Sequence, residues 1–188
     1  MSITLDSSST ALIVVDMQKD FLCEDGALYG GDAVKKIISG VRSLLSDALE
    51  SSLPVVFTQD YHLPDDPEFL VWPPHCIQET EGAEIIDELR GSEDSAYFVR
   101  KRKYSAFFGT DLDLHLREKD VKTIMIAGVL TNICVLHTAG DGASLGYRIV
   151  VPSDCVAALS EYEEGYALHH MDKVFQATVV SASEIQFS

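Results

Sequence analysis

The sequence predicts an α/β fold, in which a doubly wound, mostly parallel six-stranded sheet carries helices on both faces. Two observations lead to this prediction. Apolar runs alternate with amphipathic segments along the whole chain, and such alternation is typical of parallel strands connected by helices. The chain has 188 residues, of which 46% are hydrophobic and 23% charged. This length and composition suit a single globular domain over residues 1–188.

The strands are expected where short apolar runs, many of them rich in β-branched residues, lie between polar or turn-forming residues. In chain order these runs are residues 11–16, 54–58, 97–100, 123–127, 148–152 and 177–180. The helices are expected where apolar residues recur at spacings of three and four, as Val34, Ile37, Val41 and Leu45 do in the first of them. The helical segments are residues 32–50, 84–89, 111–119, 133–145 and 161–174.

One connection is much longer than the others. Residues 61–82, between the second and third strands, are rich in proline and acidic residues. A loop of this length in a compact domain is usually functional or disordered. Because it contains histidines and aromatic residues, we expect it to serve the function.

Charge and cysteine content limit the partners and the compartment. The net charge of −16 argues against nucleic acid or an anionic membrane surface as a partner. No apolar run approaches the roughly 20 residues that span a bilayer, and the first residues run into a strand rather than a signal segment. The four cysteines are far apart and form no CxxC pair, so we expect free thiols in a reducing cytoplasm.

Reactive side chains follow four of the predicted strands. Asp16 ends the first, Asp60 follows the second, Lys101 follows the third and Cys134 follows the fourth. In an open α/β sheet these carboxyl ends meet at one edge, where ligands bind. We therefore expect the four side chains to gather there.

Cys134 is a candidate nucleophile because a strand-to-helix junction offers backbone N–H groups and a helix end that lower a thiol pKa. Asp16 could accept its proton and Lys101 could stabilise the thiolate. From the residues alone, Cys134 could equally be a core thiol and Asp16 a cap after the strand. Lys101 lies in the basic run 100–103, and strand alternation does not decide which of these residues points inward.

The long loop holds candidate metal ligands. Asp60, His62, Glu68 and His75 offer oxygen and nitrogen donors that suit Zn²⁺ or a similar divalent ion. The alternative is a pair of solvated surface histidines.

Three aromatic residues are candidates for the substrate site. Trp72 is held by two following prolines, Phe21 lies five residues after Asp16, and Tyr104 lies shortly after Lys101. They are either core residues or a stacking surface for a planar ligand.

Five motifs occur in a fixed order between residues 10 and 180. They are Asp16-Met17-Gln18-Lys19-Asp20-Phe21, Asp60-Tyr61-His62, Trp72-Pro73-Pro74-His75-Cys76, Lys101-Arg102-Lys103-Tyr104-Ser105-Ala106-Phe107 and Gly128-Val129-Leu130-Thr131-Asn132-Ile133-Cys134-Val135. Together they resemble the nicotinamidases, which belong to the isochorismatase-like cysteine hydrolases. The resemblance covers nearly the whole chain.

The resemblance implies roles for individual residues. Asp16, Lys101 (rather than Lys103) and Cys134 match the catalytic residues. Asp60, His62 and His75 match the metal ligands, to which some members add a carboxylate at the position of Glu68. A cis peptide bond between residues 129 and 130 is implied, with an oxyanion hole made by the backbone N–H groups of Leu130 and Cys134. Phe21 and Trp72 would sandwich the substrate ring, with Tyr104 beside them.

The implied activity is hydrolysis of nicotinamide, a small aromatic amide, to nicotinate and ammonia in NAD salvage. The implied cofactor is a divalent metal ion, zinc or else manganese or iron, in a cytoplasmic homo-oligomer. Two positions depart from the pattern, since many nicotinamidases have an acidic residue at Asn132 and glycine at Glu79. The alternatives are a related cysteine amidohydrolase for carbamoyl or ureido groups, and a non-catalytic metal-binding member. An isochorismatase proper fits less well, because it lacks the cysteine and the metal set.

Overall fold

The central feature of the computed structural model, which describes residues 2–91 and 96–188, is a seven-stranded parallel sheet. The strands follow the order β4-β3-β2-β5-β6-β8, and β7 pairs with the end of β5. The chain thus winds outward from β2 in one direction and from β5 in the other, so the prediction of a doubly wound fold is confirmed. The predicted count of six strands is one too low, because the two-residue strand β7 is too short to give a sequence signal. Its strands are β2 (Thr10–Val15), β3 (Val55–Asp60), β4 (Tyr97–Lys101), β5 (Thr123–Val129), β6 (Arg148–Pro152), β7 (Val156–Ala157) and β8 (Thr178–Val180).

Both faces of the sheet are covered, which is why its middle strands are apolar without alternation. Every residue of β2, β3 and β5 is buried. Leu12 and Val14 of β2 pack in one core cluster with α2 (Asp32–Lys36) and α3 (Ile38–Glu50). Ala11, Ile13 and Val15 pack in a second cluster on the opposite face. Helices α4 (Leu112–Glu118), α5 (Leu136–Ser144) and α6 (Glu161–Val174) contribute to that second cluster.

Three predicted helices take a different form. The helix expected at 84–89 is extended at first, because its backbone bonds to the start of α1 (Lys19–Leu22) and to the residues before it. Lys19 donates to Glu84, and Ile86 donates to Met17. Only the 3₁₀ helix η3 (Asp87–Leu89) follows. The helix expected at 133–145 begins earlier, as the π-helical turn η4 (Thr131–Val135) ahead of α5. The helix expected at 32–50 is interrupted at Ile37.

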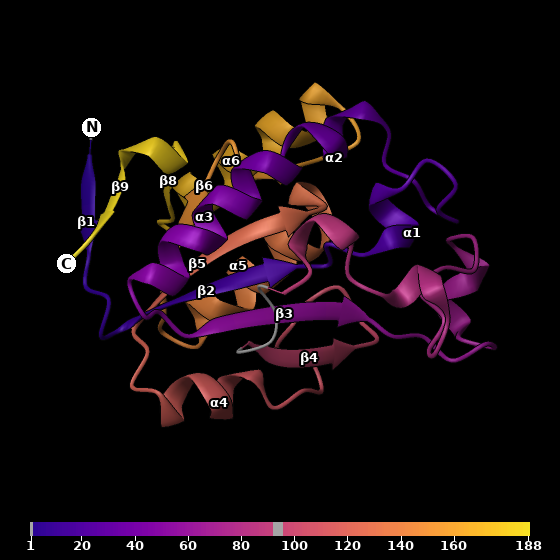
Figure 1. Ribbon diagram of the computed structural model, residues 1–188, viewed down its shortest axis with the longest axis horizontal. Helices are drawn as coiled ribbons and strands as arrows, with labels where there is room; N and C mark the ends of the chain where they lie inside the picture. The colour runs from indigo at the N-terminus through magenta and orange to yellow at the C-terminus, as the bar shows by residue number, and fades with distance from the viewer. Residues whose placement is uncertain (1, 92–95) are drawn as a thin grey trace.

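The long connection after β3 is ordered by short helical turns, η1 (Pro67–Leu70) and η2 (Glu81–Ala83). In Figure 1 the arrowheads of β2 to β5 point toward the side where this connection and α1 lie. At the far side, β1 (Ile3–Leu5) and β9 (Ile185–Phe187) form a parallel pair that brings the chain ends together (Figure 1), after the 3₁₀ turn η5 (Ala182–Glu184). Strands this short carry too few residues for a periodic signal, so they were not expected. No helix in the described part of the chain is long and apolar enough to cross a membrane.

Candidate active site

Asp16 stands at the point where β2 ends. Its backbone is left-handed, with φ 50°, a conformation that aspartate tolerates better than most residues. The carboxyl group is fully buried, and the hydroxyl of Thr58 on β3 donates to its Oδ1 at 2.6 Å. Burial raises the pKa of Asp16, while Lys101 opposes this and Asp60 reinforces it. Its proton affinity is thus above that of a surface carboxylate, which suits a proton acceptor.

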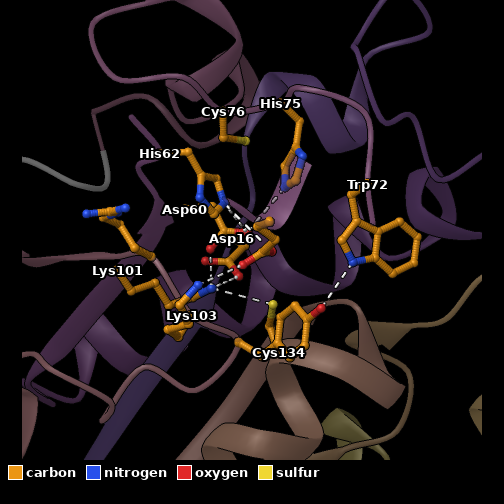
Figure 2. Close-up of polar contacts among 12 residues, drawn as sticks. Asp16, Asp60, His62, Trp72, His75, Cys76, Lys101, Lys103 and Cys134 are labelled. Carbon is orange, nitrogen blue, oxygen red and sulfur yellow. Dashed lines mark hydrogen bonds and ion pairs between the residues drawn. The ribbon is translucent and has the colours of Figure 1, made fainter. Parts of the chain in front are cut away.

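Lys101, the last residue of β4, connects the groups at this edge (Figure 2). Its buried ammonium lies 2.8 Å from Asp16 Oδ2, 2.5 Å from Asp60 Oδ1 and 3.5 Å from Cys134 Sγ. Burial alone would lower the pKa of Lys101, but the two carboxylates and the thiol raise it well above its usual value. Lys101 is therefore a permanent cation between two acids and a thiol.

Cys134 lies in the π-helical turn that follows β5 and is 6% exposed. Burial raises the pKa of its thiol well above the usual value; Lys101 opposes this effect, and Asp16 and Asp60 add to it. The net direction is thus upward, opposite to the lowered pKa that the strand-to-helix junction predicts. The thiol is held protonated and needs a base to become a nucleophile.

The end of β5 approaches β2 very closely. Gly128 has φ 114°, and a Cβ on it would lie 2.1 Å from the carbonyl oxygen of Val15, so only glycine fits. The next peptide bond, Val129–Leu130, is cis, as the resemblance implies. Leu130 and Cys134 both line the adjoining cavity.

Asp60 joins the catalytic edge to a cluster of metal-ligating groups. Gln18 fixes its backbone, accepting from the Asp60 N–H and donating to the Asp60 carbonyl, each at 2.8 Å. Burial favours a higher pKa, but Lys101 and the nearby His62 lower the pKa of Asp60 to about 2. While Oδ1 contacts Lys101, Oδ2 lies 3.9 Å from His62 Nε2 and 3.9 Å from His75 Nε2. One carboxylate thus belongs to both parts of the site.

The donor atoms of Asp60, His62 and His75 fit a divalent metal. One from each residue lies within 4.8 Å of the others, and all three residues are buried. His75 Nδ1 lies 2.7 Å from the Pro73 carbonyl, so Nδ1 carries the proton and leaves Nε2 with a free lone pair. His62 Nε2 is buried with no hydrogen-bond partner among the described residues. Unpaired nitrogens beside a carboxylate are the arrangement that zinc and similar ions bind.

Glu68 lies at the margin of this cluster. Its Oε1 is 3.9 Å from His62 Nε2, and its Oε2 is 3.4 Å from the half-exposed Lys103 ammonium. It belongs to a second possible ligand group with His62 and Asp66. Its position fits a further ligand with one oxygen, while Lys103 neutralises the other.

Asp66 was not anticipated from the sequence. Its buried Oδ2 lies 3.2 Å from His62 Nδ1, and Arg102 donates to the same oxygen from Nε at 2.9 Å. Burial favours a higher pKa, but the Glu68 N–H, Arg102 and His62 lower the pKa of Asp66 to about 2. A carboxylate behind a ligating histidine orients the ring and strengthens its donor nitrogen, and Asp66 lies within ion-pair distance of Nδ1, although Nδ1 makes no hydrogen bond to a described residue. Residues 62–66 are not helical, so the four-residue spacing between His62 and Asp66 gave no signal in the sequence.

The three predicted aromatic residues border one cavity above Cys134. Trp72 Nε1 donates to the Tyr104 hydroxyl at 3.1 Å (Figure 2), and the Phe21 ring lies 5.4 Å from the His75 ring. The cavity is also lined by residues that sequence reasoning missed: Leu28, Tyr29, Val129, Ile133 and Leu159. These are apolar or aromatic residues from separate segments, and only the folded chain brings them together.

The two departures from the nicotinamidase pattern lie outside this lining. Glu79 is exposed and left-handed, with φ 63°, a conformation that glycine adopts without cost, so the usual glycine there has a backbone reason. Asn132 turns toward α6, where its Nδ2 lies 3.4 Å from Glu163 Oε1. Neither residue replaces a group at the catalytic edge.

Comparison with known proteins identifies the family. A model of the isochorismatase domain matches residues 10–184. The chain belongs to the isochorismatase family. Among isochorismatase-family structures, nicotinamidase/pyrazinamidase PncA from Bacillus subtilis is 37% identical and superposes with a TM-score of 0.88 over 92% of this chain and 100% of that one.

Other isochorismatase-family relatives differ in the amide they act on. N-carbamoylsarcosine amidase from Thermoplasma acidophilum is 37% identical and has a TM-score of 0.85, covering 95% of this chain and 99% of its own. The nicotinamidase/pyrazinamidase of Mycobacterium tuberculosis is 35% identical over 178 residues, which cover 86% of this chain and 93% of that protein. This protein is thus a hydrolase of a family whose members act on more than one amide.

Proposed function

We propose that the protein is a metal-dependent nicotinamidase, which hydrolyses nicotinamide to nicotinate and ammonia. The observation that carries the proposal is the contact of one buried lysine with Asp16, Asp60 and Cys134 beneath a cavity lined by aromatic residues. A flat neutral ring fits aromatic walls, and an amide beside Cys134 meets a thiol with a base in reach.

The residues support a thioester route. Asp16 takes the proton of Cys134 as Sγ attacks the amide carbon, and the Lys101 ammonium stabilises the sulfur as it becomes anionic. The backbone N–H groups of Leu130 and Cys134 are proposed to hold the oxyanion, and each such donor is typically worth about 3 kcal/mol. Asp16 then returns the proton to the departing nitrogen, which leaves as ammonia. Water, deprotonated by Asp16, cleaves the thioester and releases the carboxylic acid and the thiol.

Asp60, His62 and His75 would hold the divalent ion, with Glu68 as a further ligand. When bound, the ion supplies a Lewis acid that orients the pyridine nitrogen and a water molecule beside the cavity. Zinc suits the mixed nitrogen and oxygen donors, and manganese and iron are the other candidates.

A second candidate function is hydrolysis of a carbamoyl amide, which the similarity to N-carbamoylsarcosine amidase supports. An N-carbamoyl amino acid carries a carboxylate that needs a cation or several donors. The described residues that line the cavity include no lysine or arginine, and they include the acids Asp60 and Glu68. With the proposed ion bound, that ion would be the one cation at the described cavity lining for an anionic substrate, and the apolar and aromatic walls suit a neutral aromatic amide better.

The test is ammonia release from nicotinamide, pyrazinamide and N-carbamoylsarcosine, with and without added zinc, manganese or iron. We expect the two aromatic amides to be hydrolysed, and Cys134→Ala and Asp16→Asn to lower kcat by about 10³-fold or more. Cys23→Ala, which removes a half-buried thiol away from the cavity lining, is the matched control and should keep full activity. Release from the carbamoyl substrate alone would establish the second candidate instead.

A further inference from the structure

The turn that carries Cys134 is tied to the first turn of α6. The side chain of Thr131, the first residue of the turn, is fully buried. Its hydroxyl donates to Glu164 Oε2 at 2.8 Å. A hydroxyl bonded to a carboxylate is among the stronger hydrogen bonds of proteins. The nucleophile's turn is therefore anchored from the helix side as well as from the strands.

Two groups favour the charged form of Glu164 against its burial. Burial raises the pKa of Glu164, but the Thr131 hydroxyl and the backbone N–H of Ala158 oppose that rise. Ala158 is buried and directly precedes Leu159, which lines the cavity, as do Leu130 and Ile133 beside Thr131. The hydrogen bond to Thr131 is thus the link by which Glu164 reaches the catalytic turn.

The position of Cys134 makes the reaction rate sensitive to any shift of the turn that carries it. Its Sγ is 3.5 Å from the Lys101 ammonium, which two carboxylates on the strand side hold in place. Lys101 cannot follow if the turn shifts, so any movement changes the distance between sulfur and its partners. A misplacement of about 1 Å at a reacting group can cost on the order of 100-fold in rate.

We propose that Glu164 is a positioning residue for the nucleophile. It acts through Thr131, fixing the turn that presents Cys134. Because neither Glu164 nor Thr131 lines the cavity, Glu164 contributes to the rate of the chemical step and little to ground-state binding. This inference rests on the proposed function in taking Cys134 as the nucleophile.

The test compares Glu164→Gln, Thr131→Val and the double variant with two controls. Glu161→Gln alters an exposed glutamate of the same helical turn, and Thr131→Ser keeps the hydroxyl. We expect Glu164→Gln and Thr131→Val each to lower kcat by about tenfold while KM stays within about twofold. Both controls should match the parent. Because the two residues act as a unit, the double variant should be no slower than the slower single variant.

Three results would overturn the proposal. One is a kcat of Glu164→Gln equal to that of Glu161→Gln, and another is a double variant whose loss equals the product of the two single losses. The third is a lower Tm with kcat unchanged, which is what a merely structural role predicts. All rates are measured on whichever amide the parent hydrolyses and are normalised to Cys134 thiol titrated in the folded protein.

A parent that hydrolyses no tested amide would contradict the proposed function, and the positioning role is then read from hydrogen exchange. Backbone amides of residues 130–135 should exchange faster in Glu164→Gln than in Glu161→Gln, because only the first variant loosens the turn. Equal exchange in the two variants would overturn the anchor itself.

Discussion

The two halves of the site are built in opposite ways. At the catalytic edge, Asp16 and Lys101 stand at strand ends, and the buried ammonium lies between two carboxylates. In the metal half, His62 and His75 come from a long connection with only short helical turns. The Nε2 atom of His62 is left without a hydrogen-bond partner in the described structure.

This difference indicates which half of the site depends on a bound metal ion. The catalytic edge satisfies its charges with the protein's own groups, so folding alone assembles it. The metal half keeps donor atoms free beside carboxylates, so we propose that an ion completes it. Asp60 links the two, since one oxygen contacts Lys101 and the other faces the histidines. Substitutions at the edge should therefore affect both stability and rate, and those behind the metal chiefly its affinity.

The largest effect is expected for Lys101→Ala. It would leave Asp16 and Asp60 buried and facing each other without a cation, and removing one partner of a buried ion pair typically costs about 3–5 kcal/mol. Urea denaturation should show this loss in the free energy of unfolding, and amide hydrolysis should disappear. Lys103→Ala is the matched control, because its half-exposed pair with Glu68 is worth about 1 kcal/mol or less. Equal free energies of unfolding for Lys101→Ala and Lys103→Ala would contradict the claim that the catalytic edge, unlike the metal half, is held together by buried charge pairs.

A smaller, more selective effect is expected for Asp66→Asn. Loss of the carboxylate behind His62 should weaken metal affinity by about 10- to 100-fold, because the ring is less well fixed and its donor nitrogen less basic. Competition with a chelator measures this, with kcat at saturating metal close to that of the parent. The exposed Asp65→Asn is the control. If Asp66→Asn and Asp65→Asn have the same metal affinity, Asp66 holds the loop in place and does not support the metal ligand.

The smallest effect concerns pH. Burial raises the pKa of the Cys134 thiol well above that of a free thiol. The reactive thiolate forms only as pH rises through that value, so its fraction at neutral pH is below that of a free cysteine. Alkylation by iodoacetamide, followed at Cys134 by mass spectrometry, should therefore show a midpoint more alkaline than that of N-acetylcysteine. A more acidic midpoint would mean that the helix end and Lys101 dominate after all.

The sequence was most informative where strands end. Because parallel strands present their carboxyl ends together, the sequence alone places Asp16, Asp60, Lys101 and Cys134 in one group. The selection of Lys101 from its basic run needed the resemblance. The register supplies the physical reason, since Asp60 and Lys101 are direct partners on neighbouring strands, which places their side chains together.

What the sequence did not reveal depends on the path of irregular segments. The contact of Asp66 with Arg102 requires the loop and the end of β4 to lie side by side, and no local pattern encodes that. The same holds for Leu159 and Tyr29 in the cavity wall. A strand-to-helix junction can be seen in the sequence, while the burial of Cys134 beside two carboxylates, which raises the pKa of its thiol, cannot.

The pairing of β1 with β9 has a practical consequence for handling the protein. The amide of Ser7 donates to the carbonyl of Ser188 at 3.0 Å, so both ends of the chain are held at the side of the sheet away from the loops (Figure 1). Affinity tags, fluorophores or immobilisation linkers attached at either end would project away from the cavity. A surface-tethered or fused form should therefore leave the cavity mouth accessible to small molecules.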